Sequence, residues 1–422
     1  MKNFEPMFFS HDLSLAPFDL VFKEQNGERA INLLTNILRS VIDKHAPLRK
    51  KRVKHPSLPP WLTNDIIEAM AERDSFKKAK RLVEYRSQRN KVNTMVRKAK
   101  AQYFNKLLEK NKSIKTVWSA INEILNTFKN KTSNPASHVH PEEFNRFFLS
   151  VSDRLLSQEK SESDGLHNSA LKKYCQKKLP LCTNFSIPLL TVLDVGRCIE
   201  SLEMKKSMGP DKISPFFLKL ALPYIVEPLT HAYNQCIKQN SFPSSLKTAK
   251  IIPLPKGSHC KEPGDFRPIS ILPILAKPLE KHVQKCLLEY MENNNLFHEF
   301  QSGFRENHSC SSAINSLVNT WISSINSHNF TGAVFLDFKK AFDLVNHDIL
   351  LKKMDIYMKN NESLSFFKSY LSNRYQYVSV NCNTSQYGNI HCGVPQGSNI
   401  GPLLFCIYIN DLPLNLRDKS LC

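Results

Sequence analysis

The spacing of apolar residues along this chain predicts helices in its first part and adds strands and turns later. Between Glu28 and Lys44 the apolar positions recur every three or four residues, which is the helical period. The same spacing returns between Lys91 and Tyr103. Nine of the 12 glycines lie at or after Gly209, so turns become frequent only there. We therefore expect an α+β protein whose N-terminal part is helical.

Three stretches in the second half carry clearer signals. Thr191 and Asp194 have the spacing of a capping box, so a helix is predicted to begin there. Ile251 with Ile252, and then residues 266–272, indicate two strands that are joined by a glycine-containing loop. Residues 333–336 form a short apolar run, which is typical of a strand buried on both faces.

Proline-rich and polar stretches indicate where the chain divides. Ser57–Trp61 contains two adjacent prolines, and polar residues dominate from Ser157 to Ser169. We expect four segments, namely 1–60, a basic helical extension over 61–156, a flexible connection over 157–189, and a folded body over 190–422.

Basic charge is concentrated in one stretch. The chain has 58 Lys and Arg against 38 Asp and Glu, a net charge of +20. Residues 44–112 alone contribute +14 of this net charge. A localised basic strip suits a surface that follows nucleic-acid phosphates better than it suits general solubility. A solvated charged face over a packed apolar stripe is the alternative, and the two can coexist because Lys and Arg stems cover apolar surface.

Targeting, membrane and metal-module signals are absent from the sequence pattern. The first 20 residues lack the basic start and apolar block of a secretory signal, and no run of 18 apolar residues occurs. The 11 cysteines form no C-x-x-C pair and no zinc-module spacing with histidines. We expect reduced thiols, a nuclear or cytoplasmic location and no membrane partner.

Candidate chemistry lies at Asp337, which ends the apolar run 333–336. Its carboxylate could bind a cation, pair with a base or lie at the solvent edge. Lys339 and Lys340 follow, as a site that handles phosphates would need. Residues 392–405 then read CGVPQGSNIGPLLF, a Gly/Pro-containing loop whose backbone could approach a flat or phosphorylated ligand closely.

Six blocks follow one another in the second half of the chain. They are KSMGPDKISPFFLK from Lys206, AKIIPLPKG from Ala249, GDFRPISILPILAKPLEK from Gly264, QSGFRENHSCSSAI from Gln301, FLDFKKAFDLVNHDILLKKM from Phe335 and GVPQGSNIGPLLFCIYINDL from Gly393. In sequence and order they resemble the reverse transcriptases of non-LTR (LINE-type) retrotransposons. The resemblance implies a right-hand polymerase fold with fingers and a palm, the palm being a small antiparallel sheet backed by helices.

The resemblance also implies roles for individual residues toward deoxynucleoside triphosphates. Lys256 and Arg267 would hold the triphosphate, which suits a point charge and a fork of donors, although plain surface charges on an exposed hairpin are the alternative. Phe342 occupies the sugar-gate position that excludes a ribose hydroxyl, although a plain core aromatic is the alternative. The nucleotide pocket would be lined by Pro395, Gln396 and Gly397.

A metal-assisted mechanism is implied in the same way. Two Mg²⁺ ions would activate the primer hydroxyl and stabilise the leaving pyrophosphate. Asp337 would be the bridging, catalytic carboxylate and the Phe338 carbonyl a further metal ligand.

RNA template and DNA primer are the implied partners. Arg305 and His308 would contact their backbone, together with the basic helix residues Lys91, Arg97, Lys98 and Lys100. For His308 a structural role is the alternative.

The chain also departs from the family pattern. It contains no Asp-Asp dipeptide, whereas family members supply further metal ligands from an aromatic-x-Asp-Asp hairpin. The segment 1–60 resembles the linker after an endonuclease that this sequence does not include. We therefore expect a truncated copy that lacks the thumb and is inactive by itself. A non-catalytic RNA- or DNA-binding remnant and a group II intron maturase-like polymerase are the alternatives.

Overall fold

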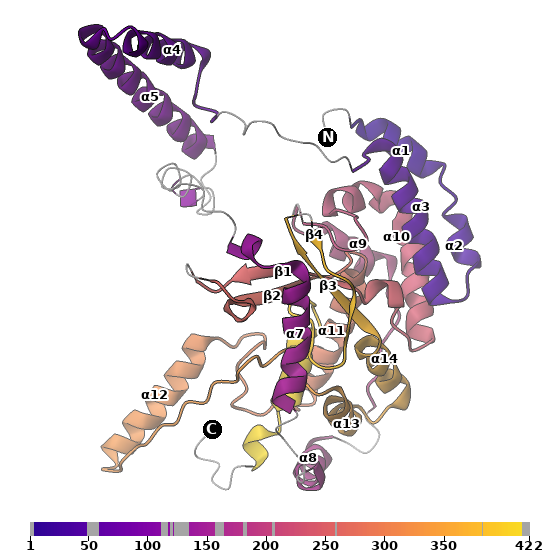
Figure 1. Cartoon of the computed structure of the whole chain (residues 1–422). Helices are drawn as coiled ribbons and strands as arrows, with labels where there is room; N and C mark the ends of the chain where they lie inside the picture. Colours follow the sequence, from indigo (N-terminus) through magenta and orange to yellow (C-terminus); the bar gives the residue numbers. More distant parts are fainter. Residues whose placement is uncertain are drawn as a thin grey trace. The chain divides into compact units, whose positions relative to one another are not determined.

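A computed structural model describes most of the chain in two compact units. The described residues are 4–48, 59–110, 117–118, 121, 135–156, 164–179, 184–204, 207–257, 260–381 and 383–415. One unit combines the N-terminal residues 1–48 with residues 135–422, and the other covers 49–134 (Figure 1). These units separate after residues 48 and 134, whereas the sequence suggests divisions after residues 60 and 156, so the four expected segments stay a prediction.

The unit over 49–134 contains a helical hairpin. Helices α4 (Asn64–Lys78) and α5 (Leu82–Lys110) pack along each other, and Ile66 of α4 and Val92 of α5 are buried. The Gln88 side chain donates from α5 to the carboxylate of Glu72 on α4, at 2.6 Å. The predicted basic helix thus lies within α5.

The N-terminal helices of the larger unit pack on its longest described helix. These helices are α1 (Pro6–Ser14), α2 (Asp19–Lys23) and α3 (Gly27–His45), and they contact α10 (Pro215–Lys238). Asn26 caps α3 by accepting from the Arg29 N–H. Gly27 lies so close to Cys236 that a Cβ at this position would come within 2.5 Å of its sulfur. The segment expected to be a linker is therefore part of the same core as α10.

Helix α9 (Val192–Glu200) begins as its sequence predicts. Thr191 and Asp194 form both hydrogen bonds of the capping box, and Val195, Cys198 and Ile199 face inward. Further helices complete the core around α10: α8 (Asp164–Lys178), α11 (Ala276–Asn293), α13 (His347–Met358), α14 (Asn361–Leu371) and α15 (Gly401–Ile409). Short 3-10 turns are η1 (Pro135–His138), η2 (Ser244–Leu246), η3 (Pro263–Asp265) and η4 (Leu412–Asn415).

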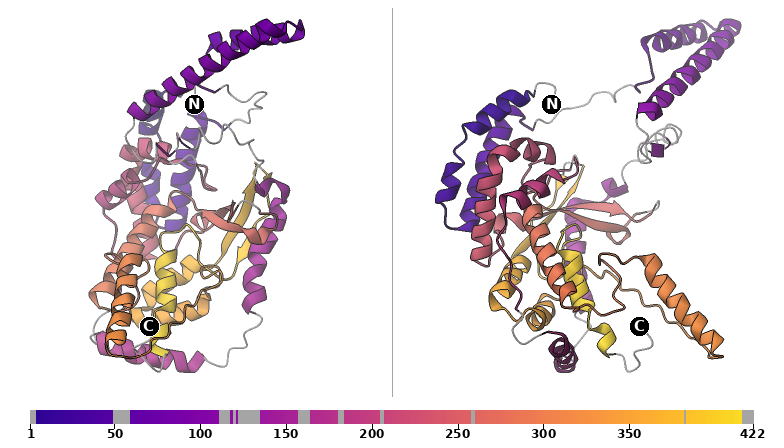
Figure 2. Two further views of the ribbon diagram at one scale, coloured as in Figure 1. Left: turned by 90° about the vertical axis from the view of Figure 1, so that its left-hand side faces the viewer. Right: turned by 180° about the vertical axis from the view of Figure 1, so that it is seen from behind.

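A small sheet lies beside this helical core. Its strands are β1 (Ala249–Pro255), β2 (Phe266–Ile271), β3 (Arg374–Val380), β4 (Asn383–Thr384) and β5 (Gly388–Ile390). The predicted strands β1 and β2 are confirmed as an antiparallel pair, with Ile251 opposite Ser270. Helix α7 (Pro141–Leu156) runs across the sheet (Figures 1 and 2) and buries Phe144 against it.

The sheet is mixed and not wholly antiparallel. Strand β1 pairs in parallel with β3, placing Ile251 opposite Val378, whereas β3 pairs antiparallel with β4 and β5. Parallel pairing is possible here because the long helical connection between β1 and β3 lets the chain return to the same end of the sheet.

The predicted strand at 333–336 is wrong for this structure. Residues 329–338 have no regular secondary structure, and Val334 is 86% exposed. A strand needs a neighbour for its backbone hydrogen bonds, and no described segment pairs with this one. The preceding helix α12 (Cys310–Asn326) projects from the body in Figure 1 and in the right-hand view of Figure 2, and it has no buried residue.

None of the helices in the described ranges is long and apolar enough to cross a membrane.

Candidate nucleotide-binding site

The loop 392–400 is tied to the turn that contains Phe342. The Gly393 N–H donates to the carbonyl of Val345, and the Val394 N–H donates to that of Phe342, each at 2.8 Å. His347 adds a hydrogen bond from its ring Nε2 to the Gly393 carbonyl. Gly393 has a φ of +86°, and a Cβ there would meet backbone atoms of Asp343 at 2.8 Å. Glycine at this position lets the loop lie directly against the Phe342 turn, and its close approach to a ligand stays a prediction.

The same loop is also tied to strand β2. The Ser270 N–H donates to the carbonyl of Gln396 at 3.0 Å. Gly397 has a φ of +136°, and a Cβ there would come within 2.4 Å of the Ser270 carbonyl oxygen. The loop therefore joins the β1–β2 hairpin to the Phe342 turn, and these three segments form one site.

A buried acid holds the far end of the loop, and the sequence did not reveal it. Glu280 on α11 is fully buried, and its carboxylate accepts from the Asn399 N–H and the Tyr370 hydroxyl, each at 3.0 Å. Burial raises the pKa of Glu280, and these hydrogen bonds oppose the shift. The sequence signal for this site was an acidic residue within the apolar stripe of a helix. It did not identify the partners of Glu280, because Tyr370 and Asn399 lie 90 and 119 residues away along the chain.

Asp343 lies inside this site. The Gln396 side chain donates to its carboxylate at 2.9 Å. Burial raises the pKa of Asp343, while the hydrogen bond from Gln396 and the charges of Lys340 and Lys256 act in the opposite direction. Lys256 from the β1–β2 hairpin is therefore close enough to influence a carboxylate beside the loop.

Phe342 packs between two other aromatic rings. It stacks on Phe405 of α15 at a centroid distance of 5.0 Å and meets Phe304 edge-on at 5.9 Å. These contacts fix the ring at the edge of the core, where it is half-buried. They fit the core-aromatic interpretation and leave the sugar-gate role as a hypothesis.

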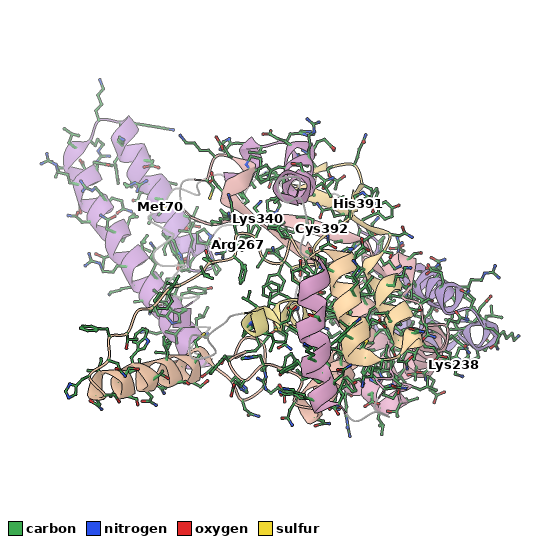
Figure 3. The ribbon with its side chains drawn as sticks, turned by 90° about the horizontal axis from the view of Figure 1, so that it is seen from below. Met70, Lys238, Arg267, Lys340, His391 and Cys392 are labelled. Carbon is green, nitrogen blue, oxygen red and sulfur yellow. The ribbon has the colours of Figure 1, made fainter. Side chains whose placement is uncertain are left out.

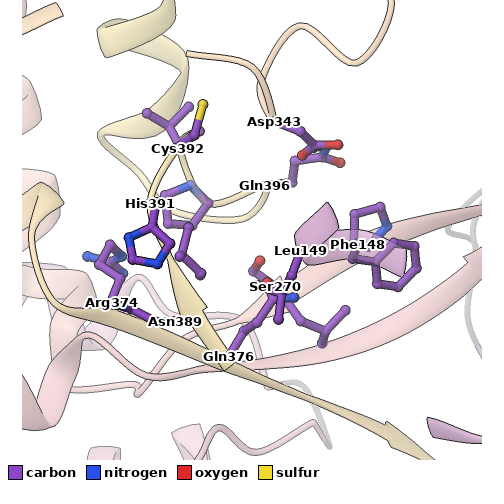
Figure 4. A pocket seen from close by; sticks show the side chains of 16 residues that line it. Phe148, Leu149, Ser270, Asp343, Arg374, Gln376, Asn389, His391, Cys392 and Gln396 are labelled. Carbon is purple, nitrogen blue, oxygen red and sulfur yellow. Dashed lines mark hydrogen bonds between the residues drawn. The ribbon is translucent and has the colours of Figure 1, made fainter. Parts of the chain in front are cut away.

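A pocket of about 300 Å³ lies behind the loop (Figure 4). Its walls come from α7, from β1 and β2, from β3 and β5, and from the loop itself. Pro395 and Gln396 line it together with Asp343. Pro395 and Gln396 thus line a cavity, and their role toward a nucleotide stays a prediction.

Lys256 and Arg267 belong to the projecting β1–β2 hairpin. Arg267 is exposed, and it pairs with Leu254 across the hairpin. Figure 3 shows Arg267 and Lys340 in the same part of the molecule. The Lys256 ammonium group donates to the Gly264 carbonyl at 2.8 Å, within the hairpin loop. Both cations are thus accessible from solvent.

Asp337 and Phe338 lie on the exposed segment that follows α12. Across the described ranges, no three His, Cys, Asp or Glu side chains come together as a group that could hold a metal ion. Mg²⁺ prefers several oxygen ligands, and Asp337 with one carbonyl provides too few. The described residues alone therefore do not fit the expected ion.

The residues predicted to contact nucleic acid differ in their exposure and in the contacts that they already make within the chain. Arg305 forms a two-pronged ion pair with Glu292, at 2.9 and 2.7 Å, and also donates to the Gln301 carbonyl. His308 is exposed, with its ring bonded to the Glu306 carbonyl. On α5, Lys91, Arg97 and Lys98 are exposed, whereas the Lys100 ammonium lies 4.6 Å from the Trp61 ring centre.

Comparison with known proteins supports the resemblance of the six blocks. Residues 254–422 match the family described as reverse transcriptase (RNA-dependent DNA polymerase). Over 235 residues the chain is 32% identical to the probable RNA-directed DNA polymerase from transposon BS of Drosophila melanogaster, covering 56% of this chain and 26% of that protein. The chain is homologous to reverse transcriptases of LINE-type retrotransposons.

Two further relatives from the same fly agree. The probable RNA-directed DNA polymerase from transposon X-element is 31% identical over 235 residues, and that from mobile element jockey is 31% identical over 231 residues. Each match covers 54% of this chain and 25% of the relative. The chain thus matches about a quarter of the length of these curated relatives. The reverse-transcriptase match contains the β1–β2 hairpin from Leu254 onward, the Phe342 turn and the loop at 392–400.

Proposed function

We propose that this chain supplies the fingers and part of the palm of a right-hand, LINE-type RNA-directed DNA polymerase. The observation that carries the proposal is the convergence of three of the resembling blocks on one loop. The loop bonds to the Phe342 turn through Val394 and to β2 through Gln396. Homology to named polymerases adds support.

Within this proposal, the β1–β2 hairpin and the loop receive the incoming deoxynucleoside triphosphate. Lys256 and Arg267 attract its phosphates from the exposed hairpin. Pro395, Gln396 and Gly397 shape the pocket beside it. The Phe342 ring, fixed by Phe304 and Phe405, limits the space available at the sugar.

The metal part of the proposal requires more than the described residues provide. Mg²⁺, when bound, would supply charge stabilisation at the phosphates. Asp337 and the Phe338 carbonyl would contribute two of its ligands, and further carboxylates would be needed. RNA template and DNA primer would lie against His308 and the basic face of α5. A role for Arg305 would require its ion pair with Glu292 to open.

Equilibrium binding of a deoxynucleoside triphosphate tests the proposal without requiring catalysis. The purified chain is titrated in the presence of an RNA template annealed to a DNA primer. Lys256→Met and Arg267→Met should each weaken nucleotide binding tenfold or more, because each removes a phosphate contact worth about 1.5–3 kcal/mol. Lys261→Met, at an exposed lysine of the same hairpin, is the matched control and should leave binding unchanged.

Equal affinities for all of these variants would contradict the proposed nucleotide site. Phe342→Ala should reduce the preference for deoxyribonucleotides over ribonucleotides, and an unchanged preference would assign that ring to packing alone. Primer extension on RNA by the purified chain measures catalysis separately from binding.

A second candidate function is nucleic-acid binding without catalysis. The observation that favours it is the separate helical hairpin of α4 and α5, which carries exposed basic residues outside the region that matches reverse transcriptases. Its test is the salt dependence of RNA binding described in the Discussion.

A further inference from the structure

The pocket behind the loop contains an arginine whose charge is incompletely satisfied. Arg374, the first residue of β3, is 1% exposed and lines the pocket. Its Nη1 donates to the Tyr370 carbonyl at 2.9 Å, and its guanidinium lies 4.7 Å from the centre of the Tyr370 ring. Its Nε and Nη2 have no hydrogen-bond partner among the described residues.

These two nitrogens form one complete edge of the guanidinium fork. A fork of this kind binds two oxygens of a single carboxylate or phosphate. Arg305 shows the same geometry when satisfied, because its Nε and Nη2 hold the two carboxylate oxygens of Glu292. The same edge of Arg374 has no hydrogen-bond partner in the described part of the chain, and both of its nitrogens are buried.

A buried, unpaired guanidinium is costly unless an anion completes it. The acid at hand is Glu280, but Tyr370 and Asn399 already donate to its two oxygens. The positive charge of Arg374 helps to lower the pKa of Glu280, against the larger effect of burial. After desolvation, it is also a further cause of the lowered pKa values of Lys247 and His347. The described residues therefore leave the positive charge of Arg374 without a directly bonded counter-charge.

The surrounding pocket has room and polar groups for such an anion. Arg374 lies opposite Ile390 in the sheet, and Asn389 and His391 on either side of Ile390 also line the pocket. Figure 4 shows Arg374 and His391 at one end of the pocket, with Asp343 and Gln396 at the other. His391 is exposed and makes no side-chain hydrogen bond with a described residue, so no such bond holds its ring in place.

We infer that this pocket binds a phosphoryl group through the free edge of Arg374, with His391 controlling access. The group could belong to inorganic pyrophosphate or to the backbone of a single RNA strand, which share the same oxyanion. A phosphate suits the fork better than a single-atom anion does because two of its oxygens match the two donors. The inference rests on the Arg374 geometry and does not require polymerase activity.

Calorimetric titration of the full chain with two probes tests the site. The probes are inorganic pyrophosphate and an eight-nucleotide single-stranded RNA, both in buffer without divalent metal. Arg374→Lys keeps the charge but loses the fork, and it should weaken binding of the responsible probe at least tenfold. Arg374→Met should abolish this binding and, because it removes an unpaired buried charge, should leave the melting temperature equal or higher.

Lys247→Met is the matched control, since Lys247 is also a buried cation but does not line the pocket. It should change the affinity less than threefold. Binding of pyrophosphate that depends on Arg374 assigns the site to a free anion, and binding of RNA alone assigns it to a strand phosphate. The inference is overturned if neither probe binds the wild-type chain, or if both Arg374 variants bind as the wild type does.

Discussion

Gly397 is a residue at which the loop comes close to strand β2. Its φ of +136° is accessible to glycine and strained for other residues, and a Cβ would lie 2.4 Å from the Ser270 carbonyl oxygen. The sequence predicts that the backbone of this glycine-containing loop can approach a ligand closely. It does not indicate that Ser270 is a neighbour of Gly397, because the two residues meet only after β2 and α15 have packed on the same core.

Gly397→Ala should therefore lower the free energy of unfolding of the larger unit by about 1–3 kcal/mol. The measurement is urea denaturation followed by circular dichroism. Gly257→Ala is the control, since a Cβ at Gly257 meets no atom within 4 Å. Similar stabilities of the two variants would mean that the loop can move away from β2 at little cost.

Asp211 gives a second prediction at the residue scale. One of its carboxylate oxygens accepts from the Ile274 N–H at 2.6 Å, and the other is buried without a partner among the described residues. Desolvation raises its pKa from 3.8 to about 6, against the backbone hydrogen bonds that lower it. Because the folded state favours the protonated form, the stabilising contribution is complete below about pH 4 and is lost as the pH rises through 6.

Asp211→Asn should remove this pH dependence. Relative to the variant, the wild type should lose roughly 2 kcal/mol of stability between pH 4.5 and pH 7. Melting temperatures of both proteins across this range provide the measurement. Parallel pH profiles would show that Asp211 titrates as it does in the unfolded chain.

At the scale of elements, the sequence predicts those that depend on neighbours in the chain. The capping box at Thr191 and the β1–β2 pair are confirmed because each is stabilised by residues within about 20 positions. The strand expected at 333–336 is apolar enough, but strand formation also needs a partner, and periodicity carries no information on that. For the same reason the fork of Arg374 and the buried Glu280 could not be predicted.

Helix α12 has no buried residue, so its apolar side chains should contribute little to stability. Its apolar stripe contains Ile314, Ile322 and Ile325, which are 58%, 50% and 63% exposed. Ile314→Lys combined with Ile325→Lys should change the free energy of unfolding by no more than about 0.5 kcal/mol. It should also reduce self-association, because exposed apolar patches promote it. Thermal melts and light scattering measure the two effects.

Leu279→Ala on α11 is the substitution to compare with the α12 double variant, because Leu279 is fully buried. Leu279→Ala should lower the free energy of unfolding by about 2–5 kcal/mol. A comparable loss from the α12 double variant would show that this helix is packed against other residues in solution.

At the scale of the whole molecule, the basic charge is concentrated around one compact unit and the sheet belongs to the other. The sequence shows this division through the +14 carried by residues 44–112, and the structure describes α4 and α5 as a unit separate from the sheet. What the sequence could not provide is the inclusion of residues 1–48 in the larger unit, which depends on the packing of α3 against the distant α10.

The basic face of α5 should determine how RNA binding responds to salt. Changing Lys91, Arg97 and Lys98 to Gln should reduce the slope of log affinity against log salt concentration by about 2, since each lost phosphate contact on a single strand contributes about 0.7. The control changes three exposed lysines of α8, Lys172, Lys173 and Lys177, to Gln. Equal slopes for both triple variants would mean that RNA does not track the α5 face.

The parallel pairing of β1 with β3 has a consequence for how the protein is made. Residue 249 leaves the ribosome 125 residues before its partner strand begins at 374. At typical synthesis rates of 5–20 residues per second, the interval is roughly 6–25 s. Throughout that time one edge of the β1–β2 hairpin has no native neighbour. Nascent chains should therefore depend on chaperones most strongly while this interval lasts.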